Sequence, residues 1–77
     1  MNTPSTIVSA KIRGAMGETQ VTQIALSQRT GMGQTLISER LRGQVPWRVD
    51  EVVHVARALG VPLQRLLPLD ELAERAS

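Results

Sequence analysis

Glycine residues divide this chain into short segments that suit α-helices. Gly17, Gly31, Gly43 and Gly60 each follow a stretch in which apolar residues recur at helical spacing. Glycine enters the left-handed conformation that often ends a helix without the steric cost that other residues have. We therefore predict an all-α fold of five short helices, because no stretch shows the strict alternation of a β-strand.

The expected helix boundaries follow from these glycines and from residues that cap helix starts. After a flexible arm of residues 1–5, Ser5 or Thr6 is expected to cap a first helix that runs to about residue 16 and ends at Gly17. Thr22 is expected to cap the second helix. The second to fifth helices are expected over residues 23–30, 34–42, 49–59 and 62–67, and residues 68–77 form a tail or a further short helix.

The expected core is aliphatic, because Trp47 is the only aromatic residue. A chain of 77 residues makes one small domain, residues 1–77, which buries roughly 60% of its unfolded surface. Trp47 is expected to pack over the loop before the fourth helix. The residues expected inside are Val8, Ile12, Ala15, Met16, Leu26, Met32, Ile37, Val49, Val52, Val53, Ala56, Leu59, Leu63, Leu66 and Leu67.

The residue inventory argues against several kinds of site. The chain has no cysteine, which leaves neither a disulfide nor a thiolate zinc site, and His54 is its only histidine. We expect His54 on the surface of the fourth helix. The sequence offers no nucleophile–base set, and its GMGQT stretch lacks the Gly-Lys-Ser/Thr ending of a phosphate-binding loop. We therefore expect no enzyme activity, no metal and no cofactor.

Charge is unevenly distributed along the chain. Residues 1–48 carry six basic and two acidic residues, a net charge of +4, whereas residues 49–77 carry three basic and five acidic residues, a net charge of −2. This division suits a negatively charged partner on one side, although an ordinary mixed surface can have the same composition. The N-terminus lacks a signal-peptide pattern and no apolar run is long enough to cross a membrane, so we expect a cytoplasmic protein.

The turn at residues 31–33, Gly-Met-Gly, separates two short helices in the manner of a helix-turn-helix. Ser27 is small where the two helices are expected to cross. With the crossing angle fixed, the start of the second helix projects from the surface, where it can enter a DNA major groove. Gln34 and Thr35 lie at that start and carry hydrogen-bonding groups. The residues expected to fix the crossing angle from inside are Leu26, Met32 and Ile37.

Residues 22–43, TQIALSQRTGMGQTLISERLRG, resemble the helix-turn-helix of the phage lambda repressor and Cro-like family. Residues 49–67, VDEVVHVARALGVPLQRLL, resemble the fourth and fifth helices of that family, and the resemblance covers roughly residues 7–67. It implies a five-helix domain that binds double-stranded DNA at an operator and regulates transcription.

The resemblance also implies roles for individual residues. Gln34 matches the glutamine that reads adenine, and Thr35 matches a position that reads a base edge. Leu36, Ser38 and Glu39 continue the base-reading surface, where Leu36 suits a thymine methyl group and Glu39 suits cytosine N4. The residues placed at the DNA backbone, or bracing the others, are Gln23, Arg42, Arg48 and Trp47, the last as an alternative to packing over the loop.

The sequence departs from the family at Arg40, where an aliphatic residue is usual. Leu41, one position later, is expected to do that packing instead, with a possible rotation of the end of the reading helix. The preferred reading is a phage-type repressor or Cro-like regulator. Two alternatives remain open: an antitoxin that binds a toxin and its own operon, and a protein-interaction module without DNA binding.

A homodimer through residues 66–76 is a further hypothesis, because family members commonly pair across a two-fold axis. Leu66, Leu69, Leu72 and Ala73 recur there at helical spacing, beside Asp70, Glu71 and Glu74. The alternative is that Leu66 closes the core while residues 69–77 fray.

Overall fold

The computed structural model describes residues 3–69, which form four α-helices and one short 3₁₀-helix. Within this range there is no β-strand, so the prediction of an all-α fold is confirmed. None of the helices in the described range has both the length and the apolar character required to cross a membrane. The elements are α1 (Pro4–Thr19), α2 (Gln23–Thr30), α3 (Gln34–Leu41), α4 (Val49–Leu59) and η1 (Leu63–Arg65).

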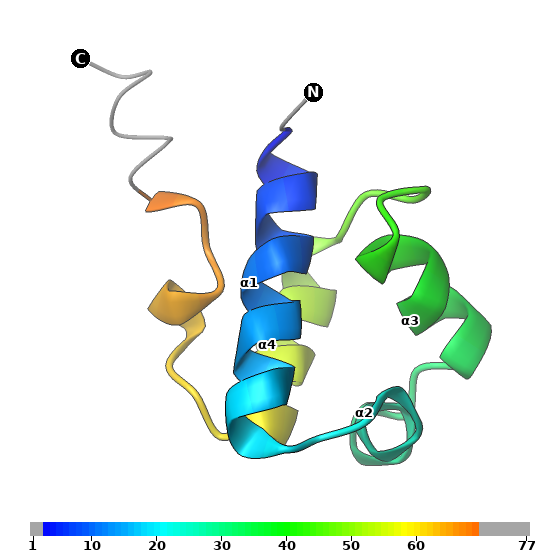
Figure 1. Ribbon diagram of the computed structural model, residues 1–77. Helices are drawn as coiled ribbons and strands as arrows, with labels where there is room; N and C mark the ends of the chain where they lie inside the picture. Colours follow the sequence, from blue (N-terminus) through cyan, green and yellow to red (C-terminus); the bar gives the residue numbers. More distant parts are fainter. Residues whose placement is uncertain (1–2, 70–77) are drawn as a thin grey trace.

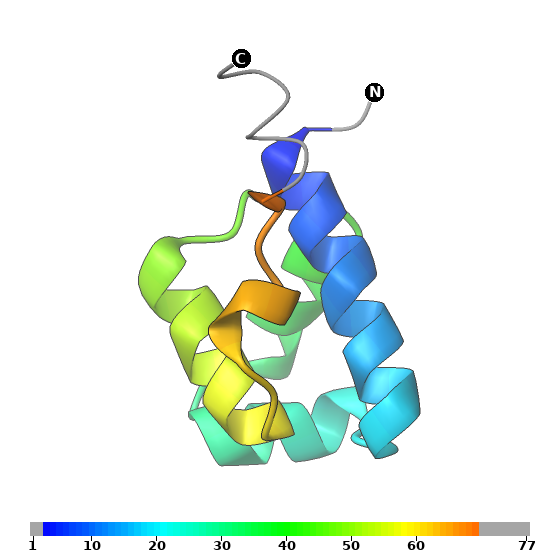
Figure 2. The ribbon, with the colours of Figure 1, turned by 90° about the vertical axis from the view of Figure 1, so that its left-hand side faces the viewer.

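Helices α1 and α4 lie side by side and form the middle of the molecule (Figures 1 and 2). Helices α2 and α3 lie on one side of this pair and the segment that contains η1 lies on the other (Figure 1), so that this segment is in front in Figure 2. Helix α2 packs mainly on α4, and α3 packs mainly on α1. The two helices of the helix-turn-helix are thus supported from behind by different helices.

The core between these elements is aliphatic, as expected. Its buried apolar residues are Val8, Ile12, Ala15, Val21, Leu26, Ile37, Leu41, Val52, Val55, Ala56, Leu59 and Leu66. Met16, Met32, Leu63 and Leu67 are only partly buried against this core. Two expectations for α4 are wrong. Val49 is 77% exposed because it is the first residue of α4 and lines an open groove at the edge of the core, and Val55 is fully buried where Val53 was expected.

The ends of α1 differ from the sequence prediction. Thr3 is the N-cap, because the Thr6 N–H donates to Thr3 Oγ1 (3.1 Å) and the Thr3 N–H donates to Thr6 Oγ1 (2.8 Å). Pro4 therefore occupies the first helical position, where its missing N–H costs nothing, and the expected arm is shorter. Gly17 lies inside the helix, which ends after Thr19 with Gln20 in the left-handed region (φ 58°).

The predicted ends of the other α-helices agree more closely with the structure. Thr22 caps α2 by accepting a hydrogen bond from the Ala25 N–H (3.1 Å), as predicted. Gly31, Gly43 and Gly60 all have positive φ, of 77°, 78° and 70°. Helix α4 has the predicted bounds, and α3 ends one residue earlier than predicted, at Leu41.

The predicted fifth helix is a single 3₁₀ turn, so the expectation of five α-helices is wrong. Pro68 explains the difference, because proline disfavours the α conformation of the preceding residue and has no N–H to extend a helix. Leu66 lies fully buried just after the turn and closes the core. The rest of the predicted C-terminal segment, from Asp70 onward, lies outside the described residues.

Candidate nucleic-acid interface

Helix α3 has one buried face and one exposed face. Ile37, Arg40 and Leu41 are buried, whereas Gln34, Thr35 and Leu36 at its start are exposed. Ser38 and Glu39, the other two residues predicted to read bases, are half-buried. The exposed start of α3 offers an amide, a hydroxyl and an apolar side chain to a partner, while Ile37 and Leu41 hold the helix to the core.

The joint between α2 and α3 is fixed by hydrogen bonds as well as by packing. Ser27 Oγ donates to the Met32 carbonyl (2.6 Å), and the Met32 N–H donates to Thr30 Oγ1 (3.2 Å). Leu26 and Ile37, on either side of the turn, are fully buried. Ser27 was expected only to be small at the crossing, but its hydroxyl also satisfies a backbone group of the turn, which helps to fix the crossing angle.

Five of the predicted site residues line one hollow at this joint, with a volume of about 360 Å³. Gln23 comes from the first position of α2 and Arg42 from the end of α3, so the hollow spans both helices. The remaining predicted residues, Leu36, Glu39, Trp47 and Arg48, do not line it. Its lining residues are Gln23, Gln34, Thr35, Ser38 and Arg42.

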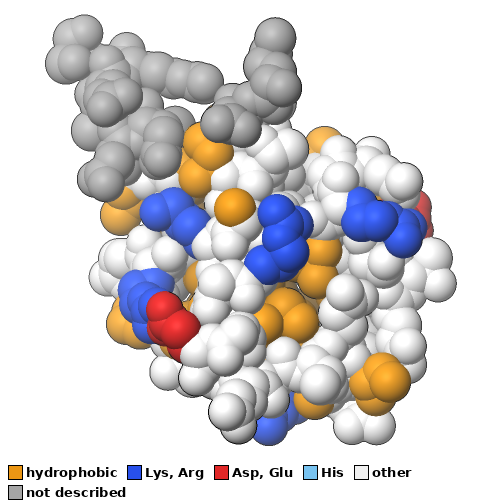
Figure 3. All heavy atoms as spheres, in the orientation of Figure 1, with side chains coloured by type: hydrophobic (Ala, Val, Ile, Leu, Met, Phe, Trp, Pro, Cys, Tyr) orange, Lys and Arg blue, Asp and Glu red, His pale blue; other side chains and the backbone are white. Residues whose placement is uncertain are grey.

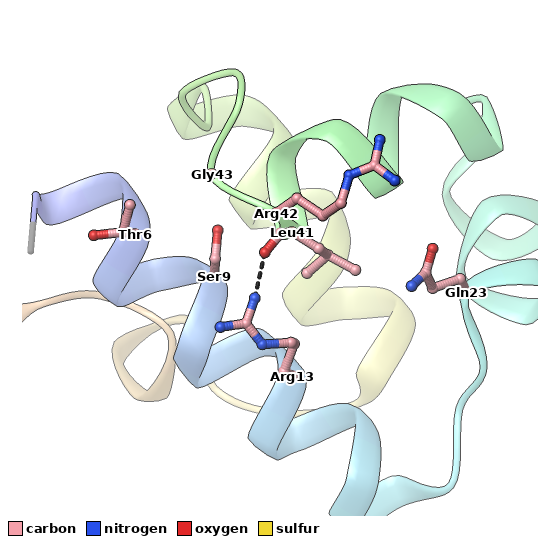
Figure 4. Close-up of a pocket in the computed structure, with 7 residues that line it drawn as sticks. All are labelled: Thr6, Ser9, Arg13, Gln23, Leu41, Arg42 and Gly43. Atoms are coloured by element: carbon pink, nitrogen blue, oxygen red, sulfur yellow. Dashed lines mark hydrogen bonds between the residues drawn. The ribbon is translucent and has the colours of Figure 1, made fainter.

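A second hollow of about 250 Å³ shares Gln23 and Arg42 with the first (Figure 4). Arg13 reaches into it from α1 and donates a hydrogen bond from Nη1 to the Leu41 carbonyl at the end of α3 (Figure 4). A cation at the C-terminal end of a helix is favourable, because the last carbonyl groups are left without partners inside the helix. The residues that line this hollow are Thr6, Ser9, Arg13, Gln23, Leu41, Arg42 and Gly43.

Arg13 is a candidate functional residue that the sequence analysis did not select. Its only signal in the sequence is a positive charge next to Ile12 on the first helix, which is also what a solvated surface residue looks like. Neither hollow is lined by an acidic side chain in the part of the chain that the structure describes. Together the two hollows form a polar surface that is lined by two arginine side chains and by no acidic one, which favours a negatively charged partner.

Trp47 packs against the core from the loop between α3 and α4, which confirms the packing interpretation. Its indole N–H donates to Ser9 Oγ (2.8 Å), and its backbone N–H donates to Ser5 Oγ (2.8 Å). These bonds tie the loop to α1. A contact of Trp47 with a DNA backbone stays a prediction.

Arg48 precedes α4 and is exposed, with its Nε 3.6 Å from Asp50 Oδ1. An ion pair between two such exposed side chains contributes little, so the guanidinium of Arg48 is available to another anion. Arg48 does not line either hollow, and its neighbours Trp47 and Val49 line a separate, mainly apolar groove. Lys and Arg side chains form several separate patches on the face of the molecule seen in Figure 3.

Arg40 is buried, contrary to what is usual for an arginine on a short surface helix. Its Nε lies 2.8 Å from Glu51 Oε1 on α4. Leu41 is buried as well, which confirms that it packs into the core. His54 is exposed on α4, as predicted. Among residues 3–69, no group of three or more His, Cys, Asp or Glu side chains is placed to hold a metal ion.

These features define a small all-α helix-turn-helix domain, and the comparisons with solved structures agree. The restriction-modification controller protein C.AhdI from Aeromonas hydrophila is similar with a TM-score of 0.76 and 17% identity, over 82% of this chain and 96% of that one. The DNA-binding domain of BldD is similar with a TM-score of 0.73 and 21% identity, over 88% and 100%. At such identities the likeness establishes a shared fold. No protein-family model and no curated protein matches the sequence.

Proposed function

We propose that this protein is a sequence-specific regulator of transcription that binds double-stranded DNA with α3 in the major groove. The observation that carries the proposal is the hollow of about 360 Å³ at the α2–α3 joint, where the exposed start of α3 meets Gln23 and Arg42. A reading helix must present polar groups while its other face is locked in place, and α3 meets both conditions.

Gln34 and Thr35 are the base-reading residues that this geometry supports most directly, because both are exposed at the start of α3. The Gln34 amide would pair with adenine through N6 and N7. Leu36, 44% exposed, would contact a thymine methyl group, whereas half-buried Ser38 and Glu39 would meet base edges only at close approach. Gln23 lines the same hollow as Gln34 and would brace it or contact a phosphate.

Phosphate contacts would come from Arg42, Arg48 and Arg13. Arg42 and Arg13 line one hollow, and Arg48 is exposed just before the start of α4. Such contacts carry no sequence information, but they position the reading helix and supply affinity that depends on salt.

At the finer level, we propose a phage-type repressor or Cro-like role, in which the bound protein occupies an operator. The names of the two structural neighbours, a restriction-modification controller protein and a DNA-binding domain, support a role in DNA binding and regulation. No acidic side chain in the described range lines the two hollows, which also supports DNA as the partner, although Glu39 lies beside them on α3.

The structure changes the set of residues that could form the interface of the proposed homodimer. Leu66 is fully buried in the core and is not available to a partner, whereas Leu69 is 46% exposed. Leu72 and Ala73 lie outside the described residues. Sedimentation at high concentration, followed by titration on a half-site and on an inverted repeat, tests the pairing. A monomer that gains nothing from the second half-site would contradict it.

Selection of bound sequences from a randomised duplex library tests the function. We expect one enriched sequence, bound with typically at least about 1,000-fold higher affinity than a scrambled duplex, and affinity that falls steeply with salt. Binding to both duplexes with equal affinity would contradict sequence-specific reading. No binding to any duplex, even at low salt, would favour the protein-interaction module.

A further inference from the structure

A buried ion pair connects the proposed reading helix to the helix behind it. Arg40 of α3 and Glu51 of α4 approach to 2.8 Å, with side chains only 10% and 14% exposed. Taking two charges out of water is costly, and in many proteins apolar residues replace such a pair without loss of stability. The pair therefore calls for an explanation other than stability alone.

Both partners also bond to backbone groups of the proposed interface. Arg40 Nη1 donates to the Leu36 carbonyl (3.3 Å), one turn earlier in α3. Glu51 Oε1, the same atom that meets Arg40, accepts the backbone N–H of Arg48 (2.8 Å) at the start of α4. One carboxylate oxygen thus joins the reading helix to the residue proposed to bind phosphate.

The backbone of Arg40 completes the connection. Its carbonyl accepts a hydrogen bond from Ser9 Oγ (2.6 Å), and Ser9 Oγ in turn accepts from the Trp47 indole (2.8 Å). Ser9 is only 2% exposed, so the centre of this chain of bonds is buried. Through it, α1, α3 and the loop before α4 meet at one residue of the reading helix.

We propose that Arg40 and Glu51 are positioning residues that fix the register between the base-reading surface of α3 and the phosphate contact at Arg48. This inference rests on the proposed function. An aliphatic residue in place of Arg40 would fill the space but would leave no directional bond between α3 and the start of α4. The pair would therefore act on discrimination between DNA sequences more than on affinity for DNA in general.

The decisive variant is Arg40→Met/Glu51→Gln. It removes the ion pair, while the Gln side chain keeps an oxygen for the Arg48 N–H and Met keeps apolar bulk. A matched control is Arg65→Met/Glu18→Gln, which makes the same chemical changes in an ion pair of 2.6 Å whose side chains are 48% and 60% exposed. That pair joins α1 to η1 and touches neither α2 nor α3.

The measurement is the ratio of affinities for the selected duplex and for a scrambled duplex at one salt concentration. Thermal unfolding of each variant, monitored by circular dichroism, shows whether it is folded. We expect the ratio to fall about tenfold in Arg40→Met/Glu51→Gln, the equivalent of roughly one base contact. Affinity for the scrambled duplex should stay within about twofold, because phosphate contacts carry most of it. The control should keep the wild-type ratio.

Glu51→Asp provides a second test if the double variant does not fold. The shorter carboxylate keeps the charge but cannot reach both Arg40 and the Arg48 N–H, so the ratio should again fall. A folded variant of either kind with the wild-type ratio would overturn the inference, as would an equal loss in the control. If the wild-type protein itself selects no sequence, the proposed function fails and this inference fails with it.

Discussion

Two surfaces of the molecule differ in chemistry. At the α2–α3 joint the hollows are lined by amides, hydroxyls and two arginines. Where α1 and α4 begin, a groove of about 480 Å³ is lined mainly by apolar side chains, among them Pro4, Trp47, Val49 and Leu67. The two surfaces can therefore be tested separately, the polar one for DNA binding and the apolar one for its share in stability.

The largest expected effect concerns the support behind the polar surface. Ile37 is fully buried under the joint, so Ile37→Ala should lower the free energy of unfolding by about 2–5 kcal/mol. Val49→Ala, in the apolar groove, is the matched control, and it should cost less than about 0.5 kcal/mol because Val49 is 77% exposed. Urea denaturation measures both. Equal losses would mean that the groove is as much a part of the core as the joint.

The next effect tests direct reading by the polar surface. Gln34→Ala should weaken binding to the selected duplex by about 1–3 kcal/mol and leave binding to a scrambled duplex almost unchanged. Gln64→Ala, an exposed glutamine on η1, is the control and should change neither. Fluorescence anisotropy of a labelled duplex measures the affinities. Equal losses on both duplexes would remove Gln34 from the base-reading set.

A smaller effect separates the two roles considered for Trp47. Trp47→Phe keeps most of the apolar area but loses the bond from the indole N–H to Ser9 Oγ. It should lower the free energy of unfolding by about 0.5–1.5 kcal/mol, the usual net value of one hydrogen bond, without changing the affinity for a scrambled duplex. If DNA affinity falls while stability does not, Trp47 contacts the DNA backbone instead.

The smallest expected effect is on the salt dependence of binding. Arg42→Ala and Arg48→Ala should each reduce the slope of log affinity against log salt by up to about one unit, for selected and scrambled duplexes alike. Arg65→Ala is the control on the other side of the molecule. A slope that matches wild type in all three variants would contradict phosphate contacts from the proposed surface.

Local signals predicted the helix-turn-helix well. The Thr22 cap and the glycines at 31, 43 and 60 act through bonds and φ angles within a few residues, so the sequence alone specifies them. At α1 the same kind of signal was ambiguous, because Thr3, Ser5 and Thr6 all suit an N-cap. Pro4, which favours the first helical position, was the signal that pointed to Thr3.

The sequence did not predict contacts between residues that lie far apart in the chain. Arg13 meets a carbonyl 28 residues away, and Arg40 meets Glu51 across the loop between α3 and α4. Both arginines look like surface residues until the helices are packed. Of the residues predicted to read bases, those at the start of α3 are exposed, whereas Ser38 and Glu39 are half-buried. The contacts that hold α3 in place depend on the packing of α1 and α4.

The position of Trp47 gives the protein an optical property of its own. Because Trp47 is the only Trp, Tyr or Phe residue in the chain, the intrinsic fluorescence of the protein comes from one indole. That indole is partly buried, bonded to Ser9, and next to the start of α4. A shift of its emission on adding DNA would therefore report a change at the junction of α1, the loop and α4, without any attached label.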